Sequence, residues 1–370
     1  MTKAKIIAMY LPQYHCIPEN DNFWGKGFTD WVTVKNAKPL FKGHNQPRVP
    51  LNSNYYDLSL EENVVWQAKL AKEHGIYGFG VYHYWFNSET NLLTRPAEII
   101  RDCKAVEVDY FLAWDNANWK RSWSNVAGND WTPNLDQKLQ DKTGPVILLE
   151  YIIGEKDDWK KHYDSLLSHF LSPKYIKIAN KPVFVIFNYS AKIGEMCEYW
   201  DELAKEDGFS GVHFIIKQNK SANIPASFYK FKYEPLYSGW SRTKWRVVII
   251  NKVRKFFNLE PTKRIFDYDT IWNDIITNAK KDTDGKIYHS GFVSYDDSPR
   301  RGVRGTIVIN SSAEKFGRYV KELRRISSSQ DKEFIFLTAW NEWGEGAYLE
   351  PDKNSNFDFL NSLSQGSIDL

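Results

Sequence analysis

The chain has 370 residues, of which 42% are hydrophobic and 26% charged, a globular composition that excludes a disordered, collagen-like or coiled-coil chain. The formal net charge of +3 argues against nucleic acid as a partner, and three scattered cysteines exclude a disulfide framework and a zinc site. No metal or other cofactor is therefore expected. The residues before Pro12 lack the ~7–15-residue apolar core of a signal peptide, and no stretch approaches the ~18 apolar residues of a membrane span. We expect a cytoplasmic protein.

Aromatic residues are unusually numerous, with 15 Trp, 21 Tyr and 22 Phe. A core needs few tryptophans, because each buried indole needs a partner for its N–H group. The surplus predicts an aromatic-lined cleft, because flat aromatic rings are good surfaces for sugars or bases. A tryptophan-rich core is the alternative interpretation.

Short apolar runs rich in β-branched and aromatic residues alternate with helical patterns along the chain. In chain order, strands are predicted at Ile6–Tyr10, Gly78–Tyr84, Tyr110–Trp114, Pro182–Phe187, Val212–Ile216, Lys230–Tyr233, Gly291–Ser294 and Phe334–Trp340. Helices are predicted between them at Leu60–His74, Ala97–Ala105, Trp159–Leu171, Glu195–Asp207, Tyr268–Lys281 and Ser312–Ile326. Eight strands alternating with helices predict the α/β fold class, as a (β/α)8 TIM barrel with long βα loops that forms one domain over residues 1–370. A doubly wound sheet is the alternative, but no GxGxxG motif follows the first strand.

Residues that directly follow the strands of such a barrel line its active-site mouth. The set obtained in this way is acidic, amide-rich and aromatic: Tyr10, Gln13, His15, His83, Tyr84, Trp85, Asp115, Asn116, Asn118, Asn188, Glu234, Asp296, Asp297, Asn341, Glu342 and Glu345. It contains no metal-ligand spacing and no nucleophile elbow. The available chemistry is therefore that of carboxylates among aromatic rings.

The segment TAWNEWGEGAYLEPD follows the strongest predicted strand. It intersperses acids with large aromatic residues: Glu342, Glu345 and Glu350 with Trp340, Trp343 and Tyr348. Two carboxyl groups three residues apart can face one pocket, where different surroundings separate their pKa values. One then serves as an acid and the other as a base, which is the division of labour that glycoside cleavage needs. An acid cluster at the start of a helix is the alternative.

Five blocks stand out along the chain: IAMYLPQYHCIPENDNFWGKGFTDWVTVKNAKPLFKGHNQPRVP, VYHYWFN, AWDNANWKRSW, YDDSPRRG and AWNEWGEGAYLEPD. In this order, from residue 6 to residue 352, they closely resemble the WbsX-like family. That family is similar to glycoside hydrolase family 99, the endo-acting α-mannosidases. The resemblance implies a (β/α)8 barrel that acts on glycans. Many WbsX-like members are described as glycosyltransferases of surface-polysaccharide assembly, whereas the fold and the acid pair resemble those of a hydrolase.

By position, the resemblance implies that Glu342 is the general base and Glu345 the general acid. In family 99 the base activates the sugar's own 2-hydroxyl, giving a 1,2-anhydro sugar and net retention, and the acid protonates the leaving oxygen and then activates water. His83, Tyr84 and Trp85 match the second-strand block, and Asn116, Asn118 and Trp119 match the third-strand block. We expect substrate contacts from these residues and from Tyr10, Gln13, Asp115, Glu234, Asp296, Arg300, Trp340, Asn341, Trp343 and Glu350. For Arg300, a structural salt-bridge cluster is the alternative.

One position departs from the family pattern. The third-strand block usually reads ANENW, and the position of its glutamate is Ala117 in this chain. A carboxylate that contacts substrate is therefore missing, and Asp115, unusual in its place, is a candidate substitute. Metal-dependent transfer is a further alternative, based on DxD spacings at Asp267/Asp269 and Asp282/Asp284, but both lie in polar or helical context.

The leading hypothesis is a carbohydrate-active enzyme of surface-polysaccharide metabolism, covering O-antigen, capsule or lipopolysaccharide. It would be a retaining family 99-like hydrolase of α-linked glycan that uses the Glu342/Glu345 pair. Its expected partner is a glycan or a lipid-linked oligosaccharide. A glycosyltransferase of the WbsX type is the first alternative, although the sequence shows no phosphate loop for a sugar donor. A non-catalytic glycan-binding protein is the second, favoured by Ala117.

Residues 240–264 carry eight Lys or Arg and a single acid, Glu260. Apolar residues recur among them at roughly helical spacing, which indicates a basic amphipathic helix able to lie on an anionic membrane surface. The segment thus favours peripheral association with the inner membrane face. A barrel helix with solvated charges is the alternative.

If residues 240–264 form such a helix, the protein will sediment with anionic vesicles at low ionic strength, and salt will release it. Replacing Arg246, Lys252, Arg254 and Lys255 by Gln removes four positive charges and should abolish sedimentation, with turnover of a soluble substrate unchanged. Recovery of the wild-type protein in the supernatant at low salt would assign the segment to the barrel wall instead.

Overall fold

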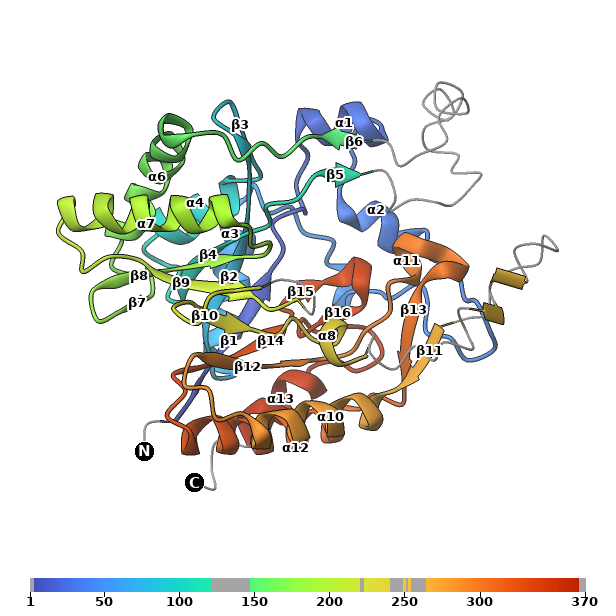
Figure 1. Cartoon of the computed structure of the whole chain (residues 1–370). Helices are drawn as coiled ribbons and strands as arrows, with labels where there is room; N and C mark the ends of the chain where they lie inside the picture. The colour runs from blue at the N-terminus through green and yellow to red at the C-terminus, as the bar shows by residue number, and fades with distance from the viewer. Residues whose placement is uncertain are drawn as a thin grey trace.

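A computed structural model describes residues 3–120, 147–219, 223–239, 249–250, 252–253 and 264–365. Its central strands are β1 (Lys5–Tyr10), β2 (Ile76–Asn87), β4 (Asp109–Trp114), β8 (Lys181–Ile186), β9 (His213–Lys217), β10 (Tyr229–Phe231), β12 (Ile287–Phe292) and β14 (Phe334–Thr338). These eight strands pair in parallel in the order β1-β14-β12-β10-β9-β8-β4-β2, and pairing of β2 with β1 closes the barrel (Figure 1). The predicted fold class is confirmed, and all eight predicted strands are present.

Helices surround the barrel. The six predicted ones are present as α3 (Glu61–Glu73), α4 (Arg95–Asp102), α6 (Lys156–Leu171), α7 (Ala191–Glu206), α10 (Tyr268–Lys281) and α12 (Ala313–Ser329). Three of them begin at a side-chain cap, because Ser190, Asp267 and Ser312 each accept a hydrogen bond from the backbone N–H three residues later. In Figure 1, α10 and α12 lie side by side against β12 and β14.

Shorter elements that the sequence analysis did not predict lie in the connections. The helical ones are α1 (Pro18–Trp24), α2 (Asp30–Lys35), α8 (Leu236–Gly239), α11 (Ser298–Arg301), α13 (Asp358–Gln365) and the 3-10 turns η1 (Leu51–Ser53), η4 (Gly302–Arg304) and η5 (Trp343–Glu345). The extended ones are β3 (Thr90–Leu92), β5 (Trp119–Lys120), β6 (Ile147–Leu149), β7 (Lys177–Ile178), β11 (Arg264–Asp267), β13 (Thr306–Ile309), β15 (Asn341–Glu342) and β16 (Ala347–Tyr348). Several of them position the candidate site.

Aromatic side chains fill the barrel. The ring of Phe336 in β14 has its centroid 5.8 Å from that of Phe111 in β4 and 5.1 Å from that of Phe231 in β10, and all three are buried. Five tryptophans are also fully buried: Trp114, Trp200, Trp272, Trp340 and Trp343. Much of the tryptophan surplus therefore belongs to the core, as the alternative interpretation predicted.

The basic segment predicted at residues 240–264 lies almost entirely outside the described residues. Of it the structure describes residues 249–250 and 252–253 and Arg264, which begins β11. Among the described helices, none combines the length and the apolar character needed to cross a membrane.

Gly78 in β2 sits where a side chain has no room. A Cβ atom at this position would lie 2.8 Å from the carbonyl oxygen of Asp109 and 3.0 Å from Cδ1 of Ile176. Because the carbonyl belongs to the paired strand β4, it cannot move without disturbing the barrel.

We therefore expect Gly78→Ala to lower the free energy of unfolding by about 1–3 kcal/mol, the usual cost of an extra carbon in a packed core. Chemical denaturation measures the difference. Gly285→Ala is the matched control, because no atom lies within 4 Å of its added Cβ. Equal denaturation midpoints for the two variants would contradict this account.

Candidate active site

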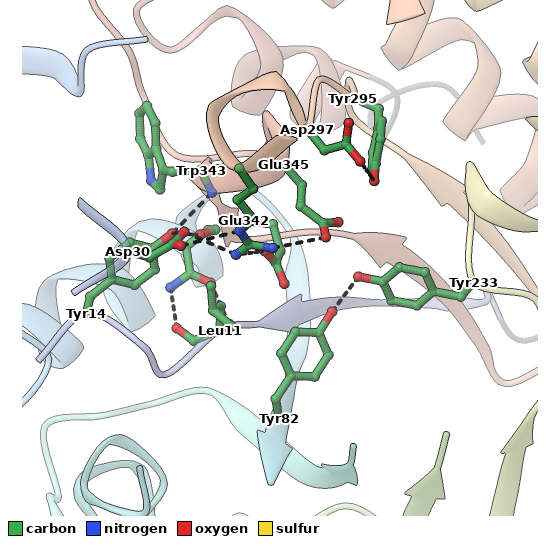
Figure 2. Close-up of polar contacts among 12 residues, drawn as sticks. Leu11, Tyr14, Asp30, Tyr82, Tyr233, Tyr295, Asp297, Glu342, Trp343 and Glu345 are labelled. Carbon is green, nitrogen blue, oxygen red and sulfur yellow. Dashed lines mark hydrogen bonds and ion pairs between the residues drawn. The ribbon is translucent and has the colours of Figure 1, made fainter. Parts of the chain in front are cut away.

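One guanidinium group joins three acids at the carboxyl end of the barrel. Arg300 Nη1 lies 3.0 Å from Glu345 Oε1, and its Nη2 lies 3.2 Å from Glu342 Oε2. The Nε and Nη2 groups also donate to the carboxylate of Asp30, at 3.3 and 3.2 Å. In Figure 2 the side chains of Asp30, Glu342 and Glu345 converge on one point. The predicted catalytic pair thus shares a single cation.

The turn that carries the two glutamates is fixed to the end of β1. Glu342 ends β15 and Glu345 ends η5, directly beyond β14. The side-chain oxygen of Asn341 accepts the Leu11 N–H at 2.7 Å, and its amide nitrogen donates to the Leu11 carbonyl at 2.9 Å. These two bonds are the ones that a neighbouring strand would make with Leu11. The Asn341 amide is therefore engaged by the backbone.

The buried hydroxyl of Tyr14 holds the same turn. It donates to the carbonyl of Asn341 at 2.6 Å and accepts the backbone N–H of Trp343 at 3.1 Å. Burial raises the pKa of Tyr14 well above its usual value, and the charges of Asp30 and Glu342 act in the same direction. Tyr14 therefore remains a neutral hydrogen-bonding group.

Gly344 allows the cluster to form. A Cβ atom on this residue would lie 2.5 Å from Arg300 Nε and 2.5 Å from Asp30 Oδ2. Any side chain here would push the arginine and the aspartate out of their contacts. The glycine in the sequence EWGE is thus explained by close packing of side chains.

Asp296 braces the loop before α11, which carries the bridging arginine. Its carboxylate accepts hydrogen bonds from Nε2 of His44 and Nε2 of Gln46, both at 2.7 Å. Burial acts to raise the pKa of Asp296, but these hydrogen bonds and the charge of Arg48 outweigh burial and lower it to about 2. Asp296 is therefore an ionised structural acceptor, and its backbone N–H donates to the Glu345 carbonyl at 2.7 Å.

The acids of the cluster outnumber its cation. Burial raises the pKa of Glu342 to about 8, and the charges of Glu345 and Asp30 add to the rise while Arg300 opposes it. At neutral pH the cluster therefore retains a proton. Among the described residues, no group of three His, Cys, Asp or Glu side chains is arranged to hold a metal ion.

Tyrosine hydroxyls face the acid pair. The hydroxyl oxygens of Tyr82 and Tyr233 lie 2.5 Å apart, and the two side chains point toward one another below Glu345 (Figure 2). Burial raises the pKa of both well above the usual value, and the charges of Glu342 and Glu345 contribute. Tyr84 is also within electrostatic reach of Glu342. The site therefore combines carboxylates with neutral phenols.

His83 and Trp85 alternate with Tyr82 and Tyr84 along β2, and the structure places them away from the acid pair. The Nε2 atom of His83 lies 2.8 Å from Nε2 of His162 in α6. The ring of Trp85 stacks on that of His162 with centroids 4.4 Å apart. Burial lowers the pKa of His83 to about 3, so this packing layer between barrel and helix is uncharged.

Tyr10, Trp343 and Glu350 belong to a buried network behind the acid pair. Glu350 accepts hydrogen bonds from Trp343 Nε1 at 2.6 Å and from the Tyr56 hydroxyl at 2.8 Å. Gln67 of α3 donates to Glu350 at 2.7 Å and accepts from the Tyr10 hydroxyl at 2.6 Å. Burial raises the pKa of Glu350 to about 7. These contacts connect β1, α3 and the turn that carries Glu342 and Glu345.

The third-strand block forms structural contacts of its own. Asn116 donates to the Asn188 carbonyl at 2.7 Å and accepts the Asn188 backbone N–H at 2.8 Å, which ties the ends of β4 and β8. The side-chain oxygen of Asn118 accepts a backbone N–H at 2.7 Å. The ring of Trp119 packs edge-on against Tyr84, with centroids 5.4 Å apart.

Three predicted residues lie in other surroundings. Glu234 accepts hydrogen bonds from the backbone and hydroxyl of Ser238 at 2.9 and 2.6 Å, and burial raises its pKa to about 7. Trp340 is fully buried, with its ring centroid 5.4 Å from that of Phe79. Gln13 is half-buried, and its carbonyl accepts the backbone N–H of Asp30 at 3.1 Å.

The structure also brings residues to the site that the sequence analysis did not select: Tyr14, Asp30, Tyr82, Lys217 and Tyr233. The sequence blocks quoted above include Tyr14, Asp30 and Tyr82. The family resemblance therefore covered these residues, but it did not indicate what they do. Lys217 directly follows a predicted strand, and the strand-end rule applied to that strand selects it.

Solved structures with this fold include glycoside hydrolases. A GH99 endo-alpha-mannosidase from Bacteroides thetaiotaomicron is 13% identical with a TM-score of 0.54, covering 98% of this chain and 96% of that chain. The complex of this enzyme with bis-tris-propane is 12% identical with a TM-score of 0.53, covering 98% of this chain and 94% of that chain. A glycoside hydrolase-like protein is 12% identical with a TM-score of 0.55, covering 99% of this chain and 94% of that chain. The fold is therefore that of the family 99-like barrels.

The chain belongs to the family described as "Glycosyltransferase WbsX", which its sequence matches over residues 6–363. It is also similar to two proteins described as "Uncharacterized protein WxcX", from Xanthomonas campestris pv. campestris strains B100 and ATCC 33913. Each is 26% identical over 370 residues, which cover 98% of this chain and 49% of the relative. The chain thus spans about half the length of these curated relatives, and the family resemblance is confirmed.

The charge imbalance around Arg300 makes a prediction about stability. The pKa of Glu342 rises from 4.5 to about 8 on folding. The contribution of this group to the free energy of unfolding is therefore fully present below pH 4.5 and is lost as pH rises through about 8. Glu342→Gln abolishes this loss. The variant should therefore melt at a progressively higher temperature than the wild type as pH rises from about 5 to 9, measured by thermal denaturation. Exposed Glu62→Gln on α3 is the control, and a constant difference across this range for Glu342→Gln would refute the charge imbalance.

Proposed function

We propose that this protein is a carbohydrate-active enzyme that cleaves α-linked glycan with net retention, with Glu342 as general base and Glu345 as general acid. The observation that carries the proposal is the Arg300 bridge between two carboxylates that follow the last barrel strand. The pair differs in burial, because the Glu342 side chain is 5% exposed and that of Glu345 is 19% exposed. The more exposed acid is suited to exchange protons with a leaving group and with water.

Two balanced steps follow from these roles. In the first, Glu342 takes the proton of the sugar 2-hydroxyl, O2 attacks C1, the bond from C1 to the leaving oxygen breaks, and Glu345 protonates that oxygen. In the second, Glu345 takes a proton from water, the water oxygen attacks C1, and O2 leaves C1 and regains its proton from Glu342. Because burial raises the pKa of Glu342 to about 8, the proton held there in the unliganded site must pass to Glu345 before the first step, so that Glu342 can act as the base and Glu345 as the acid.

The arginine has a defined part in this cycle. A guanidinium shared by both glutamates stabilises whichever of them is ionised, so the cluster can pass charge from one carboxylate to the other without moving the cation. Asp30, bound to Nε and Nη2, keeps the guanidinium plane in one orientation. The Tyr82 and Tyr233 hydroxyls are neutral donors placed to bind sugar oxygens.

The proposed substrate is a surface polysaccharide or its lipid-linked precursor, handled at the cytoplasmic face of the membrane. The WbsX family membership supports a role in polysaccharide metabolism. Residues 240–264 would supply the membrane contact through their basic side chains.

The family description favours a second candidate, transfer of a sugar from an activated donor. In that case the same acid pair would serve an acceptor hydroxyl instead of water. Replacement of the family glutamate by Ala117 is the observation behind a third candidate, glycan binding without catalysis.

We expect Glu342→Gln and Glu345→Gln each to reduce turnover at least ~10²-fold, the usual contribution of a general acid or base. Release of reducing sugar from bacterial polysaccharides is measured with and without nucleotide sugars, and Glu62→Gln is the control. Release without a donor supports hydrolysis, whereas extension that needs a donor supports transfer. Wild-type rates in either glutamate variant would remove that residue from its role.

A further inference from the structure

Two charged residues lie across the barrel from the acid pair. In the ring of eight strands, β8 lies four strands from β14 in either direction, and β9 and β4 flank it. Lys217 ends β9, and Asp115 directly follows β4. Both therefore stand at the carboxyl end of the barrel, on the side opposite Glu342 and Glu345.

The ammonium group of Lys217 rests on aromatic rings. Its Nζ atom lies 4.3 Å from the ring centroid of Phe187 and 5.9 Å from that of Tyr233. Within the part of the chain that the structure describes, Nζ forms no hydrogen bond and no ion pair within 4.0 Å. The charges of Asp115 and Glu345 act on it, so both acids are near. A half-buried ammonium with unused donor hydrogens is suited to bind ligand oxygens.

Asp115 offers the complementary group. Its backbone is fixed, because its N–H donates to the His83 carbonyl at 3.1 Å and its carbonyl accepts the Ala117 N–H at 3.0 Å. Its carboxylate makes no hydrogen bond to any described residue. Ala117, on the same turn, presents only a methyl group, so the negative charge of this turn comes from Asp115.

The neighbouring amides are already satisfied. Asn116 and Asn188 bond each other in both directions, as described above, at the ends of β4 and β8. Phe187, the last residue before Asn188, supplies an apolar surface. On this side of the candidate site, Asp115 is therefore a hydrogen-bond acceptor and Lys217 a donor, and neither side chain forms a hydrogen bond with the described residues.

We propose that Lys217 and Asp115 bind two adjacent hydroxyls of an uncharged glycosyl unit held between them and the acid pair. One hydroxyl oxygen accepts from the Lys217 ammonium, and its neighbour donates to the Asp115 carboxylate. This inference rests on the proposed function, and it names the substrate class of that site: a neutral sugar with a free vicinal diol.

The charges of the site disfavour acidic sugars. Four carboxylates, those of Asp30, Asp115, Glu342 and Glu345, outnumber the cations Arg300 and Lys217. An acidic sugar would add a further negative charge to this excess.

The test uses the 370-residue Glu345→Gln variant, which lacks the proposed acid and should bind ligand without cleaving it. Its binding is measured on an array of neutral and acidic bacterial oligosaccharides, followed by calorimetry on the oligosaccharides that bind. Lys217→Met and Asp115→Asn are introduced into this background. Each should weaken binding of neutral oligosaccharides about 10- to 100-fold, the effect of losing one hydrogen bond to a charged group. Lys5→Met is the matched control, because its Nζ lies 4.1 Å from the Tyr77 ring centroid at the opposite end of the barrel. Unchanged melting temperatures exclude misfolding.

Unchanged affinity in Lys217→Met, a loss confined to acidic oligosaccharides, or an array with no bound oligosaccharide overturns the inference. Turnover by the wild-type protein tests the proposed function separately. If the wild-type protein turns over substrate but binding is the same in Lys217→Met, only the inferred diol site is contradicted. If binding depends on Lys217 but no turnover is detected, the diol site is supported and the proposed hydrolase function is contradicted.

Discussion

The candidate site depends on one buried guanidinium that is shared by three carboxylates. Arg300 lies within 3.0–3.3 Å of Asp30, Glu342 and Glu345, and these acids come from segments separated by most of the sequence. Like charges brought this close repel, and a single cation offsets only part of that repulsion. The cluster therefore needs a rigid frame. Gly344, the Asn341–Leu11 pair and the Tyr14 hydroxyl supply it, each by a contact that a larger or less polar side chain would break.

That frame is built largely from the first loop of the chain. Between β1 and α3, Tyr14, Asp30, His44, Gln46 and Tyr56 all reach the loops that follow β12 and β14. The long first block of the sequence is thus explained by its position as one wall of the acid cluster. This wall is aromatic and hydrogen-bonded, which keeps water away from Glu342 and accounts for the raised pKa of that residue.

The fold could be predicted from the sequence because its strands are buried on both faces and read as continuous apolar runs. The segments that were missed, such as β15, β16 and α11, have two to four residues and are too short to show a period. The strand-end rule located Glu342, Glu345 and Asp115. It does not distinguish the two faces of a strand, so His83 and Trp85 were selected together with Tyr84, although alternate residues of β2 point to opposite sides. The role of Asp30 depends on a contact with a residue 270 positions away, for which the sequence holds no local signal.

The pairing of β1 with β14 has a consequence for the order of biosynthesis. The backbone of Leu11 bonds to the side chain of Asn341, which lies 330 positions later in the sequence. The N-terminal strand therefore cannot complete its contacts until nearly all of this sequence has left the ribosome. Contacts of such long range form late in folding. An incomplete chain therefore has neither a closed barrel nor an assembled acid cluster, and the three acids meet Arg300 only after synthesis has passed the last strand.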